Sequence, residues 1–178
     1  MEDVFLKGRD HLSAFMLPFG VLIVIPACLL LYSHDTLIGW QLSPTIDTLL
    51  IILGLILIFC GVVLLAVTIK MFYQLGKGTL APWAPTKNLV VEGIYGRIRN
   101  PMISGVILIA FGEGFILSSW LILLWGIIII LGNHIYFIYS EEPGLVRRFG
   151  DDYILYKKNV PRWIPRRTPW IPNQELAE

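Results

Sequence analysis

Two blocks of this sequence carry the side chains that could do chemistry, and the first covers residues 93–105. It contains Arg97 and Arg99, followed by Pro101, which suits the first turn of a helix because its missing N–H is not needed there. A helix N-terminus beside basic residues is a natural binding place for an anionic group, and Gly105, one turn later, leaves room for close approach to the backbone. Alternatively, the two arginines are anchors that reach a membrane surface.

The second block covers residues 140–166 and begins with the adjacent carboxylates Glu141 and Glu142. At the end of an apolar run, such a pair is unfavourable unless water solvates it or a cation matches it. The pair therefore marks either a solvated helix end or a site. Apolar residues then recur at helical spacing and predict one amphipathic helix over 143–159: Leu145, Phe149, Tyr153, Tyr156 and Val160.

Other polar residues lie inside the apolar runs. His134 precedes the second block by about two helical turns, and Glu113 lies between two glycines. An ionisable group within an apolar run is a functional or a packing feature. For His134 the interpretation that we favour is a hydrogen bond between helices, with membership of a site as the alternative.

Several classes of function are excluded by what the sequence lacks. The net charge is only +1, from 14 Lys and Arg and 13 Asp and Glu, which argues against a nucleic-acid-binding domain. The two cysteines, Cys28 and Cys60, lie in apolar runs and suit neither a disulfide framework nor a metal site. No HExxH motif, Cys/His cluster, dinucleotide-binding fingerprint or serine elbow occurs, so we expect no metal and no nucleic acid among the partners.

The elements that must position the two blocks are apolar helices. Hydrophobic residues make up 56% of the 178 residues and charged residues 15%, against about 25% charged in a soluble domain. Uncharged runs cover 12–31 and 49–69, and a third apolar run covers 102–139. As one helix, the third run would be about 57 Å long, too long for one crossing of about 30 Å of hydrocarbon. We therefore expect it to fold back near Ser118, Ser119 and Trp120.

The resulting expectation is an all-α integral membrane helical bundle, a single membrane domain over 1–178. Its four spans are expected at 12–32, 49–71, 102–118 and 120–139, with the last two forming a helical hairpin. Every Lys and Arg falls before the first span, within 70–101 at the end of the second span and beyond it, or after the fourth. The positive-inside rule then places both termini in the cytoplasm. Cleavage of the first run as a signal peptide is the alternative, and it would spoil this charge partition.

On this topology both polar blocks lie on the cytoplasmic face. The loop 73–101 and the C-terminal segment 140–166 are each too short for a core of their own. We expect them to fold against each other over the helix ends, with 167–178 as a frayed tail.

The residues of both blocks resemble one family, the isoprenylcysteine carboxyl methyltransferase and phospholipid methyltransferase superfamily of integral membrane enzymes. Its pattern, Gly-x-Tyr-x-x-x-Arg-[His/Asn]-Pro-x-x-x-Gly before a span, matches here at Gly93, Tyr95, Arg99, Asn100, Pro101 and Gly105. After the last span its pattern matches at Glu141, Glu142, Leu145, Phe149, Gly150, Tyr153, Tyr156, Val160 and Pro161. The resemblance covers roughly 76–166. Asn100 stands where the carboxyl methyltransferases have His, as in many prokaryotic relatives, so the expected location is a prokaryotic cell membrane.

The resemblance implies S-adenosyl-L-methionine as cofactor and a lipidic or small hydrophobic methyl acceptor that enters from the bilayer. It further implies that a carboxylate of the second block faces the sulfonium or the ammonium of the cofactor. Arg99 would then bind the carboxylate of the cofactor, and Tyr95 or Tyr153 would line the adenosine site. The implied cofactor-binding residues are Tyr95, Arg99, Asn100, Pro101, Gly105, Glu141, Glu142, Tyr153 and Tyr156. The implied catalytic residues are Glu141, as a base toward an amine or thiol, and Arg162 or Arg148, to orient a carboxylate nucleophile.

The acceptor itself stays open among a prenylcysteine, a phospholipid amine, a thiol and a quinone-like lipid. Two other functions also stay open at this point. One is a membrane reductase that uses NADPH and is related to sterol reductases. The other is a non-catalytic helical membrane subunit or lipid-binding protein. The oligomeric state is not predicted.

Overall fold

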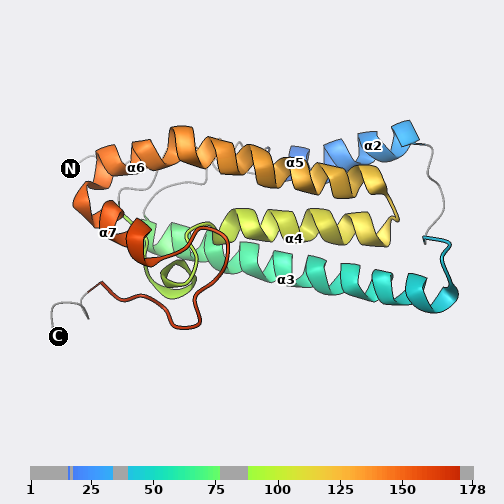
Figure 1. Ribbon diagram of the computed structural model, residues 1–178, viewed down its shortest axis with the longest axis horizontal. Helices are drawn as coiled ribbons and strands as arrows, with labels where there is room; N and C mark the ends of the chain where they lie inside the picture. The colour runs from blue at the N-terminus through green and yellow to red at the C-terminus, as the bar shows by residue number, and fades with distance from the viewer. Residues whose placement is uncertain (1–15, 17, 34–39, 77–87, 173–178) are drawn as a thin grey trace.

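The computed structural model describes residue 16 and residues 18–33, 40–76 and 88–172, and within these ranges the chain is helical and has no strand. The long apolar elements are α2 (Ile25–Ser33), which continues the π-helix η1 (Gly20–Val24), α3 (Pro44–Gly76), α4 (Pro101–Ile116) and α5 (Trp120–Tyr136). They run lengthwise beside one another: α3 contacts α4, α4 contacts α5, and α5 contacts α2 (Figure 1). The predicted all-α class is confirmed.

The hairpin between the last two apolar helices turns where the sequence predicts. Helix α4 ends at Ile116 and α5 begins at Trp120, with Ser118 between them at a φ of 53°. A residue in the left-handed region reverses the chain within a short connection. The two helices therefore run antiparallel, and both blocks of polar residues come to the same end of the bundle (Figure 1).

Short helices occupy this polar end. They are the 3₁₀-helix η2 (Gly93–Gly96), the π-helix η3 (Phe137–Glu141), α6 (Glu142–Phe149) and α7 (Asp151–Asn159). Helix α5 continues through η3 into α6. The helix of the fourth expected span therefore extends well beyond its expected end at 139.

The prediction of a single amphipathic helix over 143–159 is wrong. The chain forms two helices, α6 and α7, which meet at Gly150. Gly150 has φ 55° and ψ −132°, a conformation that is open to glycine and strained for residues with a Cβ. The chain therefore turns sharply after Phe149, and α7 lies over the end of the bundle instead of extending α6 (Figure 1).

Among the residues that the structure describes, two helical runs are long and apolar enough to cross a membrane: Pro44–Met71 and Trp120–Phe149. The apolar helices Gly20–Ser33 and Pro101–Ile116 are shorter, so the four-span topology stays a prediction. In the most apolar window of each long run only 11% and 22% of the residues are buried, unlike the core helix of a soluble protein. Soluble proteins rarely expose a continuous apolar surface, whereas such a surface is stable in contact with lipid. On α3 the exposed large apolar side chains are Ile46, Leu49, Ile52, Leu53, Leu55, Ile56, Phe59, Val62, Val63, Val67 and Leu75.

Glycines set the distance between α3 and α4. A Cβ at Gly61 would lie 2.7 Å from the carbonyl oxygen of Gly105, and a Cβ at Gly112 would lie 2.7 Å from that of Gly54. Each helix thus places two glycines, seven residues apart, against the backbone of the other. Small residues at such positions allow close helix contact in membranes, where no hydrophobic effect drives helices together. This contact fixes α4, and with it the segment that leads into α4, on α3.

Replacing Gly61 with alanine should destabilise the protein, because the new methyl group must push α4 away from α3. We expect a loss of about 1–3 kcal/mol in the free energy of unfolding, the usual result of overpacking. The matched control is Gly132→Ala on α5, where a Cβ would meet nothing within 4 Å. Thermal unfolding of the purified proteins in detergent measures both; equal melting temperatures for Gly61→Ala and the control would contradict the prediction.

Candidate functional site

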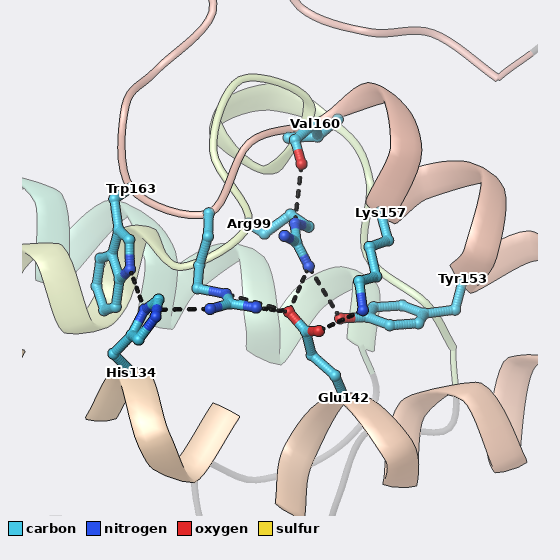
Figure 2. Close-up of polar contacts among 8 residues, drawn as sticks. Arg99, His134, Glu142, Tyr153, Lys157, Val160 and Trp163 are labelled. Atoms are coloured by element: carbon cyan, nitrogen blue, oxygen red, sulfur yellow. Dashed lines mark hydrogen bonds and ion pairs between the residues drawn. The ribbon is translucent and has the colours of Figure 1, made fainter. Parts of the chain in front are cut away.

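One buried carboxylate lies at the centre of the polar end. Glu142, at the start of α6, is only 4% exposed. Its Oε1 accepts a hydrogen bond from Arg99 Nη1 at 2.7 Å and another from Arg162 Nε at 3.1 Å, and Arg162 Nη2 forms an ion pair with the same oxygen (Figure 2). Its Oε2 pairs with Lys157 Nζ at 2.6 Å. Three cations from three different segments therefore meet on one carboxylate.

Arg99 joins the first polar block to the second. Besides Glu142, its side chain donates from Nε to the Val160 carbonyl oxygen at 2.8 Å and from Nη1 to the Tyr153 hydroxyl at 3.3 Å (Figure 2). Its backbone N–H donates to the Pro161 carbonyl oxygen at 2.9 Å. The two blocks, expected to fold against each other, are thus in direct contact, although 77–87, part of the expected loop, lies outside the described residues.

A small aromatic core lies beside these charges. Tyr153, Tyr156, Val160 and Trp170 are buried together, and the Tyr156 hydroxyl donates to the Tyr95 carbonyl oxygen at 2.8 Å. Burial raises the pKa of the Tyr156 phenol above its ordinary value, against the opposing charge of Arg99. Both predicted tyrosines of α7 are therefore neutral interior residues.

The tail expected from residue 167 onward is ordered through residue 172, the last that the structure describes. Trp170 is buried, its ring lies 6.0 Å from that of Tyr156, and its backbone N–H donates to the Gly96 carbonyl oxygen at 2.8 Å. Burial of a large aromatic ring outweighs the entropy that keeps chain ends frayed. The expectation of a frayed tail is therefore wrong at Trp170, and 173–178 lie outside the described residues.

The neighbouring carboxylate, Glu141, is in a different situation. Its side chain is half-buried, and within the described ranges no hydrogen bond or ion pair reaches it. Its charge acts on Tyr95: burial, and then the charge of Glu141, raises the pKa of that phenol. Arg148, whose exposed guanidinium lies 4.9 Å from the Phe149 ring, is close enough for its charge to act on Glu141. Of the two adjacent glutamates, Glu142 is held by three cations, whereas Glu141 has no hydrogen bond or ion pair within the described ranges.

The remaining predicted site residues lie at the start of α4. Asn100 precedes the helix, and its Nδ2 is buried without a hydrogen-bond partner among the described residues. Pro101 is buried in the first turn. Gly105 faces α3, where a Cβ would lie 3.0 Å from the Gly61 carbonyl oxygen. The space beside Gly105, which we expected to admit a ligand, is thus filled by helix α3.

Two residues of the site were missed by sequence reasoning, Lys157 and Trp163, and for His134 the interpretation that we favoured, a hydrogen bond between helices, is wrong. His134 Nδ1 lies 3.2 Å from Arg162 Nη1 and 3.1 Å from Trp163 Nε1 (Figure 2). Its bonds are thus to the C-terminal segment and not to another helix. The signal was available: from the last turn of α5, His134 faces the end of the bundle that carries both blocks.

A groove of about 450 Å³ opens beside Glu142. Its lining combines apolar and cationic side chains, so the groove suits a ligand that has both an apolar part and an anionic group. Its lining residues are Ile138, Glu142, Pro143, Val146, Arg147, Lys157 and Arg162.

Long, outwardly apolar helices that carry a polar site at one end define a helical membrane protein. The chain belongs to the phospholipid methyltransferase family, whose model matches residues 49–152, more than half of the chain. It is also similar to a Protein-S-isoprenylcysteine O-methyltransferase of Schizosaccharomyces pombe, with 35% identity over 77 residues, or 43% of this chain. The matched part spans 33% of that relative. The predicted superfamily is confirmed.

The family match covers only part of the site. It includes Arg99, Asn100, Glu141 and Glu142, and it ends before Lys157 and Arg162. Two of the cations on Glu142 therefore come from a segment beyond the matched region.

Glu142→Gln should destabilise the polar end strongly, because three cations would then face a neutral amide. Breaking a buried ion pair on one side usually costs 3–5 kcal/mol, and we expect about 3 kcal/mol here, since Lys157 remains partly solvated. The control is Glu92→Gln, an exposed glutamate outside the network. Thermal unfolding and proteolysis of the C-terminal segment provide the measurement, and a wild-type result for both would show that the network does not hold this segment.

Proposed function

We propose that this protein is an integral membrane methyltransferase that uses S-adenosyl-L-methionine and methylates a lipidic or small hydrophobic acceptor. Family membership and the similarity to an isoprenylcysteine methyltransferase support the reaction class. The observation that carries the proposal is the contrast between the two glutamates. Glu142 is fully used in holding the polar end together, whereas Glu141 presents a half-buried carboxylate without a partner among the described residues.

The residues fit the cofactor that the family implies. Bound S-adenosyl-L-methionine supplies a methyl group on a positively charged sulfur, and the molecule also carries an ammonium and a carboxylate. Glu141 is suited to one of the cationic groups, and the unpartnered Asn100 amide is a donor for an acceptor atom such as a carboxylate oxygen. Orphaned buried donors are unfavourable, which supports a ligand at Asn100.

The other predicted residues receive supporting roles in this proposal. Arg99 donates from Nε and Nη1 to the C-terminal segment and does not line the groove, unlike Arg162, so we assign Arg99 to holding the site together. Tyr95 and the tyrosines of α7 form the wall behind Glu141, and Pro101 and Gly105 fix α4. Arg162 and Arg148 orient the acceptor, and Glu141 is the base if the acceptor is an amine or a thiol. Methyl transfer is an in-line displacement, so positioning and exclusion of water supply most of the catalysis.

The distribution of charge and aromatic rings supports the four-span topology with cytoplasmic termini. Every Lys and Arg of the described ranges lies on the end of α3, between 97 and 99, or after α5. At the opposite end, Trp40 and Trp120 form an edge-to-face pair with ring centroids 4.8 Å apart. Tryptophan rings are enriched at membrane–water interfaces, and cations on the cytoplasmic side.

Cysteine labelling in intact bacterial cells tests the orientation. On a background with Cys28 and Cys60 replaced by alanine, Thr45→Cys should react with a membrane-impermeant maleimide, because the start of α3 faces outward. Thr168→Cys should react only after the cells are opened. Both positions are exposed in the structure, so a reversed pattern would overturn the topology.

Titration of the purified protein with S-adenosyl-L-homocysteine and with NADPH tests the function. We expect saturable binding of the first only; binding of NADPH alone would indicate a reductase, and binding of neither a non-catalytic subunit. A methyl-labelled cofactor incubated with total lipid extracts then identifies the acceptor.

In the same titration, Glu141→Gln should bind S-adenosyl-L-homocysteine about tenfold more weakly, or lose methyl transfer, since a charge-assisted contact contributes about 1.5–3 kcal/mol. Its melting temperature should stay near that of the wild type, because no partner among the described residues is lost. Asp151→Asn, an exposed carboxylate on α7, is the control. Normal binding and turnover in Glu141→Gln would remove Glu141 from the mechanism.

A further inference from the structure

His134 accepts from two donors at a single ring nitrogen. Arg162 Nη1 lies 3.2 Å and Trp163 Nε1 3.1 Å from its Nδ1, and His134 is exposed at the last turn of α5 (Figure 2). Guanidinium and indole N–H groups donate only and have no lone pair to offer. Nδ1 must therefore be the unprotonated nitrogen, and the ring is the neutral tautomer with its proton on Nε2.

Arg162 is fixed from two sides by this arrangement. Its Nη1 binds His134 on α5, while Nε and Nη2 bind Glu142 on α6. Because a guanidinium is planar, two anchors on different edges determine the orientation of the whole group. Trp163, the next residue, is held by the same imidazole and packs edge-on against Phe137 at 6.2 Å.

The segment around Arg162 and Trp163 has no regular secondary structure to hold it. Side-chain contacts must therefore determine where Arg162 points, and Arg162 lines the groove beside Glu142. In that groove, Glu142 is already neutralised by Arg99 and Lys157 as well. His134 is the acceptor that keeps one edge of Arg162 turned away from Glu142.

We propose that His134 is a positioning residue, which in its neutral form orients Arg162 for binding the methyl acceptor. The role in methyl transfer rests on the function proposed above, whereas the contact itself does not. Cofactor binding, which we assigned to Glu141 and Asn100, is independent of His134.

The charged groups facing His134 are Arg162 and, behind it, Glu142 with its partners Lys157 and Arg99, and no other carboxylate of the described residues pairs with Arg162. A side chain without an acceptor at position 134 should thus release Arg162 and Trp163 from α5.

The first measurement reads the contact without any activity. In protein labelled with ¹⁵N-tryptophan, the Trp163 indole resonance, assigned with Trp163→Phe, should move in His134→Leu, which removes the acceptor. It should stay near its wild-type position in His134→Asn, whose amide oxygen accepts. An unchanged Trp163 resonance in His134→Leu would overturn the proposal.

The second measurement uses labelled S-adenosyl-L-methionine with total lipid extract of the host cells as the acceptor mixture. Methyl transfer by His134→Leu should be about tenfold below that of the wild type, as loss of one charge-assisted hydrogen bond implies. His134→Asn should restore most of the activity, because its amide oxygen can accept from Arg162. S-adenosyl-L-homocysteine affinity should not change in either variant.

Asn133→Leu, one residue away, is the control, because its amide binds only the Ile129 carbonyl oxygen of its own helix. It should keep the wild-type activity. A His134→Leu enzyme with wild-type activity would overturn the positioning role. Absence of methyl transfer from every protein, together with absent S-adenosyl-L-homocysteine binding, would instead overturn the proposed function, and the indole resonance would still decide the contact.

Discussion

Burial of the Glu142 carboxylate is the constraint on which the polar end depends. An isolated carboxylate in this position would be unfavourable by several kcal/mol, so the surrounding chain must bring cations to it. Arg99 comes from the loop before α4, Lys157 from α7 and Arg162 from the extended segment beyond α7. Each of these segments is too short to bury a core alone. The ion pairs of their cations with Glu142 therefore hold these segments together over the helix ends.

This network in turn depends on packing inside the bundle. Arg99 lies two residues before the first residue of α4, so its position follows that of the helix. Helix α4 is held on α3 by the reciprocal contacts of Gly61 with Gly105 and of Gly54 with Gly112. A wider spacing between the two helices would move Arg99 relative to α6. The glycines of the apolar region and the charges of the polar end therefore belong to one chain of cause and effect.

Features with a local cause could be predicted from the sequence. The third apolar run is too long for one membrane crossing, and its length predicted the hairpin near Ser118. The charge pattern predicted that the two polar blocks lie at the same end of the bundle. The break at Gly150 could not be predicted, because the apolar spacing from Leu145 to Tyr156 is the same for one helix and for two. The burial of Trp170 depends on Tyr156 and on the backbone of Gly96, contacts that no nearby residue signals.

The sequence also could not tell Glu141 from Glu142, since adjacent residues on a helix differ only in the direction that each side chain takes, by about 100°. That difference lets one glutamate stabilise the fold while its neighbour has no hydrogen-bond or ion-pair partner among the described residues. In the proposed topology, Arg99, Lys157 and Arg162 contribute to the charge asymmetry that orients the protein, and they also hold the polar end together. With three cations on one carboxylate, the site keeps an excess of positive charge, which favours ligands that bring an anionic group to the membrane surface.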